Sequence, residues 1–416
     1  MAGRLHTFGH LLRHRPHFRR LYLSSVISML GDWLSYVAVS VVTLQHGGGA
    51  LAVGLIMVAH TLPVALTSPI AGPLADRMDR RTLLVAVRLA AGLLTLGMWL
   101  ATRDQQVGVL QVLLLLRVGV SGIAMTTGSA ALPSLVEPSE LRDANALNGL
   151  TWSVLFAAGT ALGGLLAAWL GAGEAILLDA LTFFASAALM LGLPRLHPPP
   201  AAEARPRPGF KDLAVAWRHA RGRGTSPAPP ELLPALLAKT PLALLTASCW
   251  ISLHMVADAR STALAAASVA SGLGLMHATR ALGTGIGPLI PRHWLPAEAN
   301  VAAPLALLGG AAFLLSGSPW IFLPGLFLWG AGSGHNWVAS TATLQVQSPG
   351  HLIGRMSALD LLFSTLAQAV VAVGAGLLID ATGVAESGGW LGIGLAVALW
   401  VPLMVLQTRR RRVEVA

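Results

Sequence analysis

Residues 51–81 read LAVGLIMVAHTLPVALTSPIAGPLADRMDRR. The first part, residues 51–74, is a mostly apolar run, and a helix needs about 20 such residues to cross the hydrocarbon core of a bilayer. The run ends in a charged cluster that contains Arg77, Arg80 and Arg81. An apolar span followed by basic residues is typical of a membrane helix that ends at the cytoplasmic surface.

The same character extends over the whole chain. Its 416 residues are 54% hydrophobic and 11% charged, and the mean hydropathy is +0.67. Soluble domains carry roughly 25% charged residues. A chain this apolar cannot cover itself with polar surface, so we expect an all-α integral membrane protein.

Apolar runs of similar length recur along the chain, and we expect twelve transmembrane helices. The first follows a basic N-terminus without a cleavage pattern, which predicts a retained helix rather than a signal peptide. The runs fall at 21–45, 51–74, 83–101, 107–134, 146–170, 175–193, 240–258, 264–290, 300–317, 319–342, 357–379 and 389–407.

One long polar segment, 194–239, divides the runs into two groups of six. It is rich in proline and arginine, which is typical of a linker. Residues 210–220 within it fit a short amphipathic helix on the membrane surface, and a flexible tether fits them equally well. The predicted domains are a basic N-terminus at 1–20, a six-helix bundle at 21–193, a cytoplasmic linker at 194–239, a second six-helix bundle at 240–407 and a basic tail at 408–416.

The basic residues predict the topology. With the N-terminus inside, 23 of the 28 Lys and Arg residues face the cytoplasm, and only Arg103 and Arg260 fall in outer loops. This bias follows the positive-inside rule and places both termini in the cytoplasm. Frequent alanine, glycine and arginine favour a bacterial host, so we expect the inner (plasma) membrane.

The two halves contain matching motifs. GPLADR at 72–77 recurs as GPLIPR at 287–292, and Pro138-x-x-Leu141 recurs as Pro349-x-x-Leu352 at nearly the same offset. A repeated six-helix unit around a central site is the architecture of secondary transporters.

Other classes of function find little support in the sequence. The single cysteine, Cys249, permits no disulfide within the chain, and no GxxxxGK[ST] phosphate loop occurs. The arginines stand in short clusters between apolar runs, which does not indicate nucleic-acid binding. No nucleophile–base set or metal cluster stands out, so we expect neither an enzyme nor a cofactor nor a metal. Glycines spaced four apart, as at 159 and 163, predict close helix packing.

The segment GPLADRMDRR at 72–81 resembles the loop signature of the major facilitator superfamily, with Asp79 in place of a usual glycine. Other stretches resemble its drug-efflux branch, which includes macrolide and siderophore exporters: Gly31-Asp32, Leu141 to Asn148, Leu178 to Phe184, and Gln345 to Pro349 with Gly354-Arg355. The resemblance implies two pseudo-symmetric six-helix bundles that rock about a central site. It implies a cytoplasmic gate built from Gly72, Asp76, Arg77, Arg80 and Arg81, with a second-half remnant at Gly287, Arg292, Gly354 and Arg355.

Some charged residues fall inside the apolar runs, where a charge calls for a functional or structural reason. Asp32 and Arg117 each lie about 15–17 Å from a helix end, near the midplane of a ~30 Å core. We expect them to share the cavity and to exchange a proton, a substrate or a pairing partner during transport. A static ion pair is the alternative. Asp179, near the start of its helix, is either a cap or a part of this site.

His277 and Arg280 lie three residues apart and share one helix face. Together they would suit an anionic substrate or a proton-dependent step, although Arg280 could instead extend toward the membrane surface. We expect packing roles for the other intramembrane histidines, His60, His254 and His335. Asp360 and Glu174 are predicted to cap helix N-termini.

We therefore expect a secondary active exporter that moves an amphipathic organic solute by alternating access. Proton antiport is the expected coupling, membrane lipids surround the protein, and a monomer suffices. A lipid flippase or an importer of an anionic metabolite is the first alternative. A transport-dead membrane scaffold or sensor is the alternative from another class.

Overall fold

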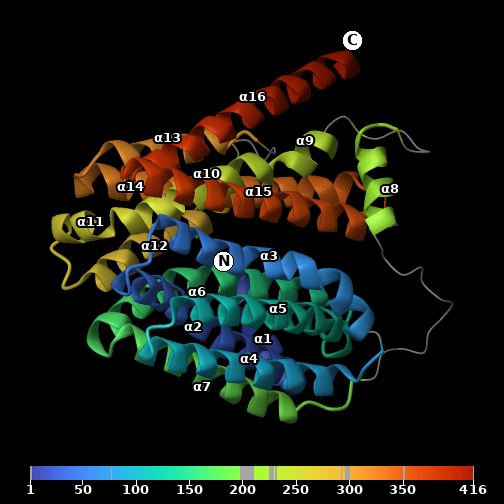
Figure 1. Ribbon diagram of the computed structural model, residues 1–416. Coiled ribbons are helices and arrows are strands. Elements are labelled where there is room, and N and C mark those ends of the chain that lie inside the picture. Colours follow the sequence, from blue (N-terminus) through green and yellow to red (C-terminus); the bar gives the residue numbers. More distant parts are fainter. Residues whose placement is uncertain are drawn as a thin grey trace. The chain divides into compact units, whose positions relative to one another are not determined.

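The computed structural model describes residues 2–75, 77–196, 210–223, 229, 232–291, 293–295, 300–349 and 352–415, and all regular structure within them is helical. The chain forms two compact units. Unit 1 comprises Met1–His46 with Pro63–Arg207, and unit 2 comprises Gly47–Leu62 with Pro208–Ala416. Helix α3 therefore contributes its first part to unit 2 and the remainder to unit 1 (Figure 1).

The helices follow the expected apolar runs. In the first part of the chain they are α1 (Ala2–His14), α2 (Pro16–Gln45), α3 (Ala50–Ala75), α4 (Arg80–Arg103), α5 (Val107–Ala131), the 3₁₀ turn η1 (Leu132–Ser134), α6 (Leu141–Trp169) and α7 (Ala172–Leu191). In the second part they are α8 (Phe210–Ala220), α9 (Leu232–Leu237), α10 (Lys239–Met255), α11 (Ala257–Ala263), α12 (Val269–Ile286), η2 (Gly287–Leu289), α13 (Ala303–Leu315), α14 (Pro319–Gln347), α15 (Ile353–Thr382) and α16 (Ser387–Val415).

A helix occupies most of each of the twelve expected spans, and the all-α membrane fold class is confirmed. Within the described residues, nine helices are long and apolar enough to cross a membrane. Helix α13 is apolar but has only 13 residues. The break between α13 and α14 confirms that two helices, not one, occupy 303–347. Residues 210–220 form a helix, so the flexible-tether alternative is wrong for this part of the linker.

The order of helix pairing recurs in the two units. In unit 1, α2 packs against α6 and α7, and α4 packs against α5 and α7. In unit 2, α10 packs against α15 and α16, and α13 packs against α14 and α16. When the spans of each half are numbered in chain order, the first span packs against the fifth and sixth in both units, and the third packs against the fourth and sixth. A duplicated six-helix unit predicts this agreement. Figure 1 labels these helices of unit 2, α10 in yellow-green and α13 to α16 in orange to red.

Glycines allow several of these contacts. A Cβ at Gly163 on α6 would lie 2.7 Å from the Leu34 carbonyl oxygen of α2, closer than side chains approach. A Cβ at Gly283 on α12 would lie 3.0 Å from the Ala331 nitrogen of α14. The four-residue glycine spacing therefore serves helix packing, as predicted, because small residues let backbones approach closely in lipid.

Asp79 determines where α4 begins. Its carboxylate accepts hydrogen bonds from the Thr82 backbone N–H (3.1 Å) and hydroxyl (2.7 Å), and its other oxygen accepts from the Leu196 N–H (2.6 Å). This arrangement satisfies an N–H that the first turn of a helix leaves unpaired. The aspartate that replaces a glycine of the family signature is thus an N-cap that also holds the chain after α7.

The chain before α2 is fixed by a surface ion pair. Arg15 lies between α1 and α2 and pairs with Glu140 (2.9 Å) and with Glu137. The Glu137 backbone N–H and the Arg15 side chain together hold the pKa of Glu140 below its usual range, against a smaller desolvation effect. Helix α1 is thereby connected to the start of α6.

Replacement of Gly163 by Ala should destabilise unit 1 by about 1–3 kcal/mol, because the added methyl group must push α2 and α6 apart. The thermal midpoint of the detergent-purified protein measures this loss. Gly149→Ala on the same helix is the matched control, since a Cβ there meets nothing within 4 Å. An equal response of both variants would contradict the close-packing role.

Replacement of Asp79 by Ala should lower the stability by about 0.5–2 kcal/mol, the usual cost of losing an N-cap. Asp79→Asn keeps a capping oxygen and should retain most of the thermal midpoint. If the asparagine variant is as unstable as the alanine variant, charge rather than capping explains the residue.

Candidate functional site

Three charged side chains meet in the interior of unit 1. Arg117 comes from the middle of α5, Asp32 from the middle of α2 and Asp179 from α7. One guanidinium nitrogen of Arg117 pairs with Asp32, and the other lies 3.5 Å from an oxygen of Asp179. One buried arginine is therefore shared between two carboxylates on different helices.

The two carboxylates differ in their exposure. The side chain of Asp32 retains 31% of its accessible surface, whereas those of Asp179 and Arg117 retain 0% and 4%. Solvent or a ligand can therefore reach Asp32 while Asp179 stays enclosed. Such a difference gives two chemically equal groups different access to protons.

Hydroxyl groups complete the coordination of Asp179. The Ser35 hydroxyl, one turn beyond Asp32 on α2, donates to one Asp179 oxygen at 2.6 Å and lies 3.4 Å from Arg117. The Thr182 hydroxyl lies 3.4 Å from the other oxygen and donates to the Asp179 carbonyl at 2.7 Å. Asp179 is therefore part of the site and not a helix cap.

A second arginine borders the cluster. Arg88 of α4 and Arg117 lie 5.9 and 5.6 Å from the centre of the Phe183 ring of α7, within the range of cation–π attraction. Arg88 is 9% exposed and interacts electrostatically with both Asp32 and Arg117. With both carboxylates ionised, two arginines and two aspartates balance each other.

The helices can approach closely enough for these contacts because residue 31 is a glycine. A Cβ at Gly31 would lie 3.0 Å from Thr182 Cβ and even closer to the Asp179 carboxylate. Any larger residue next to Asp32 would separate α2 from α7. The Gly31-Asp32 pair is therefore required by the geometry of the site.

Most residues of the predicted gate motif lie within the described part of the chain. Asp76 lies outside the described residues, Gly72 is in the last turn of α3, and Arg77 is exposed. Arg80 is buried and donates to the carbonyls of Ala75 (3.3 Å) and Ala130 (2.8 Å). Arg81 donates to the Leu191 carbonyl at 2.6 Å.

The accepting carbonyls of Arg80 and Arg81 belong to the C-terminal turns of α3, α5 and α7. Cations are stabilised at helix C-termini by the helix dipole. The basic pair therefore holds three helix ends together.

Among the second-half counterparts, Gly287 allows close backbone packing. Gly287 opens η2, where an added Cβ would lie 2.8 Å from the Ala331 carbonyl carbon, and its own carbonyl lies 3.2 Å from the His335 ring. Arg292 lies outside the described residues. Gly354 and Arg355 form the first turn of α15.

His277 and Arg280 both lie buried on α12, as expected of one helix face. The sequence did not indicate that His254 of α10 joins them, with its ring 5.1 Å from His277 and 4.0 Å from Trp250. Arg280 lies over the ring of Trp329 at 5.0 Å. No group of three or more metal-ligating side chains occurs in the described part of the chain.

One of the sequence-based assignments is wrong. Asp360 does not cap a helix, because α15 begins at Ile353 and places it two turns inside, where it pairs with Lys239 of α10. Glu174 does lie in the first turn of α7, 3.4 Å from Arg103.

Comparison with known proteins agrees with this architecture. The family model of the Major Facilitator Superfamily matches residues 21–372. The chain is 28% identical over 417 residues to the enterobactin exporter EntS of Salmonella choleraesuis (strain SC-B67), covering 96% of this chain and 95% of that protein. It is 29% identical over 186 residues to the uncharacterized MFS-type transporter YfiS of Bacillus subtilis (strain 168), a match that spans 44% of each chain.

Solved structures share the fold. A mutant of the peptide transporter POT, in complex with alafosfalin, superposes with a TM-score of 0.72 at 14% identity and 95% coverage of both chains. A bacterial homologue of the iron transporter ferroportin, in an inward-facing state, gives 0.69 at 16% identity, covering 95% of this chain and 98% of that one. Taken with the family match over most of its length, these findings show that the chain belongs to the Major Facilitator Superfamily of multi-pass membrane transporters.

Proposed function

We propose that the protein exports an amphipathic organic solute in exchange for protons, and that Asp32, Arg117 and Asp179 couple the two movements. The observation that carries this proposal is the sharing of one buried arginine between an accessible and an enclosed carboxylate. A static ion pair needs only one carboxylate. A second acceptor within 3.5 Å gives the arginine an alternative partner.

The exchange follows from charge balance. When Asp32 takes up a proton it becomes neutral and stops attracting Arg117. A buried charge that loses its partner costs about 3–5 kcal/mol. Arg117 then moves toward Asp179, its second acceptor at 3.5 Å, and α5 shifts relative to α2. When Asp32 releases the proton on the other side of the membrane, the original pairing returns and the cycle closes.

Two observations support the proposed substrate class: few charges fall within the spans, and a relative matched over nearly its full length is named as an enterobactin exporter. A lipid flippase or an importer of an anionic metabolite would use Arg117 without proton exchange. The bacterial relatives and the arginine bias favour the inner membrane with both termini in the cytoplasm. We further propose that Arg77, Arg80 and Arg81, with Asp76, form the cytoplasmic gate, and that a monomer transports.

Replacement of Asp32 by Asn should reduce proton-driven transport at least about tenfold, because the asparagine cannot carry a proton through the cycle. Proteoliposomes with an imposed pH gradient would be tested with lipophilic cations, macrolides and siderophore-like anions. Substrate exchange without a gradient should persist in the variant, since binding does not need the proton. Asp104→Asn, an exposed carboxylate of unit 1, is the matched control.

The outcomes separate the hypotheses. Full gradient-driven transport by the Asp32→Asn variant would leave Asp32 as a structural partner of Arg117. Transport of a fluorescent lipid, or inward movement of an anion without proton flux, would favour the flippase or the importer.

A further inference from the structure

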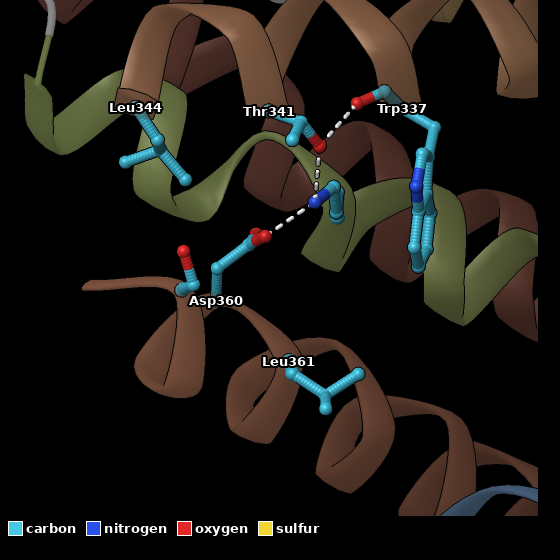
Figure 2. Close-up of a pocket in the computed structure, with 7 residues that line it drawn as sticks. Trp337, Thr341, Leu344, Asp360 and Leu361 are labelled. Carbon is cyan, nitrogen blue, oxygen red and sulfur yellow. Dashed lines mark hydrogen bonds and ion pairs between the residues drawn. The ribbon is translucent and has the colours of Figure 1, made fainter. Parts of the chain in front are cut away.

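A second buried ion pair lies in unit 2, at the edge of a cavity of about 210 Å³. Lys239, the first residue of α10, pairs there with Asp360 of α15. The cavity is lined by Lys239, Trp337, Thr341, Leu344, Ser357, Asp360 and Leu361. Figure 2 shows Asp360 and Thr341 pointing toward each other from facing helices, with Trp337 beside them.

The ammonium group of Lys239 is already engaged. It donates to Asp360 and to the Thr341 hydroxyl (2.9 Å), and its nitrogen lies 4.3 Å from the centre of the Trp337 ring. The Thr341 hydroxyl in turn donates to the Trp337 carbonyl at 2.8 Å. An anionic ligand would have to displace Asp360 from the ammonium, and the carboxylate would repel it. The cavity is therefore not suited to anions.

The Asp360 carboxylate can accept a further hydrogen bond. Oδ2 of Asp360 accepts from Lys239, whereas Oδ1 is buried and accepts no hydrogen bond from the described residues. Asp360 as a whole is 5% exposed. A buried acceptor without a donor is unfavourable, and a ligand that donates a hydrogen bond relieves the cost.

The charge of Lys239 selects among donors. A cationic ligand at Oδ1 would lie close to the ammonium on the other oxygen and be repelled by it. The aromatic face that would otherwise stabilise a cation is already next to Lys239. A neutral O–H or N–H donor avoids both penalties.

The remaining walls define the body of the ligand. Leu344, Leu361 and the Trp337 ring are apolar, and an apolar cavity of about 150 Å³ accommodates benzene. Leu344 also belongs to a buried cluster with residues of α9 and α15, which fixes that wall. Ser357 and Trp337 are exposed and leave an entrance.

We propose that this cavity binds a neutral aromatic hydroxyl compound, whose O–H donates to the Asp360 carboxylate once a turn of that side chain brings the enclosed Oδ1 to the cavity, and whose ring packs between Trp337 and the two leucines. The site goes beyond the proposed function and does not depend on it, because its residues belong to unit 2, whereas Asp32 and Arg117 belong to unit 1, and binding requires no gradient.

Three naphthalene probes of similar size test the proposal by equilibrium binding to the full-length protein in lipid nanodiscs. The probe 2-naphthol carries the donor, 2-methoxynaphthalene lacks it, and 2-naphthylmethylamine is cationic. We expect 2-naphthol to bind at least about tenfold more tightly than the ether, the factor expected for a hydrogen bond to a charged acceptor. The amine should also bind more weakly than 2-naphthol.

Asp360→Asn should weaken 2-naphthol binding by about tenfold and remove its advantage over the ether. Ser357→Phe, which leaves the ion pair intact and fills the entrance, should abolish binding of all three probes. Asp258→Asn, an exposed carboxylate of α11, should change nothing and corrects for partition into lipid.

If Asp360→Asn does not fold, the double variant Lys239→Met with Asp360→Leu replaces the ion pair by apolar groups, a change that buried pairs commonly tolerate. It should bind the ether and 2-naphthol equally. Equal affinities in the unaltered protein, or unchanged 2-naphthol binding in the Asp360 and Ser357 variants, would overturn the proposal. Tightest binding of the amine would assign a cation site instead.

Discussion

A guanidinium group enclosed among membrane helices needs an opposite charge within reach, since an unpaired one costs several kcal/mol. This constraint organises unit 1. Arg117 holds carboxylates from α2 and α7, the Ser35 hydroxyl joins them, and Phe183 lies beside the two arginines. Three helices that share no sequence neighbourhood are thereby aligned at one point, and any change in the charge of Asp32 affects all of them.

Close helix packing makes this alignment possible. Gly31 brings α2 onto α7, and Gly163 brings α6 onto α2, so that the backbones approach to distances that no other residue allows. The arginines after α3 act at the other end of the same helices, where Arg80 and Arg81 bind the terminal carbonyls of α3, α5 and α7. A charge cluster in the middle and bound carbonyls at one end leave the helices of unit 1 few independent movements.

The sequence predicted the positions of the membrane helices because most apolar runs are long, and nine of these helices are long and apolar enough to cross a membrane among the described residues. It predicted the approach of Asp32 to Arg117 because both lie at similar depth. It did not predict the partners that depend on how each helix is rotated, such as Ser35, Arg88 and the His254–His277 pair. The error at Asp360 arose because the polar first turn of α15 belongs to no apolar run. Asp76 and Arg292 lie outside the described residues, so their predicted gate roles stay predictions.

The two buried ion pairs differ in which partner can form a further interaction. In unit 1 it is the arginine, and in unit 2 it is the carboxylate, so we expect different chemistry from the two sites. In unit 1 Arg117 has two carboxylates within 3.5 Å, so it keeps one partner when the charge of the other is removed. In unit 2 the cation is fully engaged and the carboxylate keeps one unused oxygen among the described residues, so the pair can stay intact while a neutral donor binds. Two carboxylates next to Arg117 allow the arginine to move when the charge of one of them changes. The unused oxygen of Asp360 instead allows the carboxylate to recognise a hydrogen-bond donor while it stays paired with Lys239.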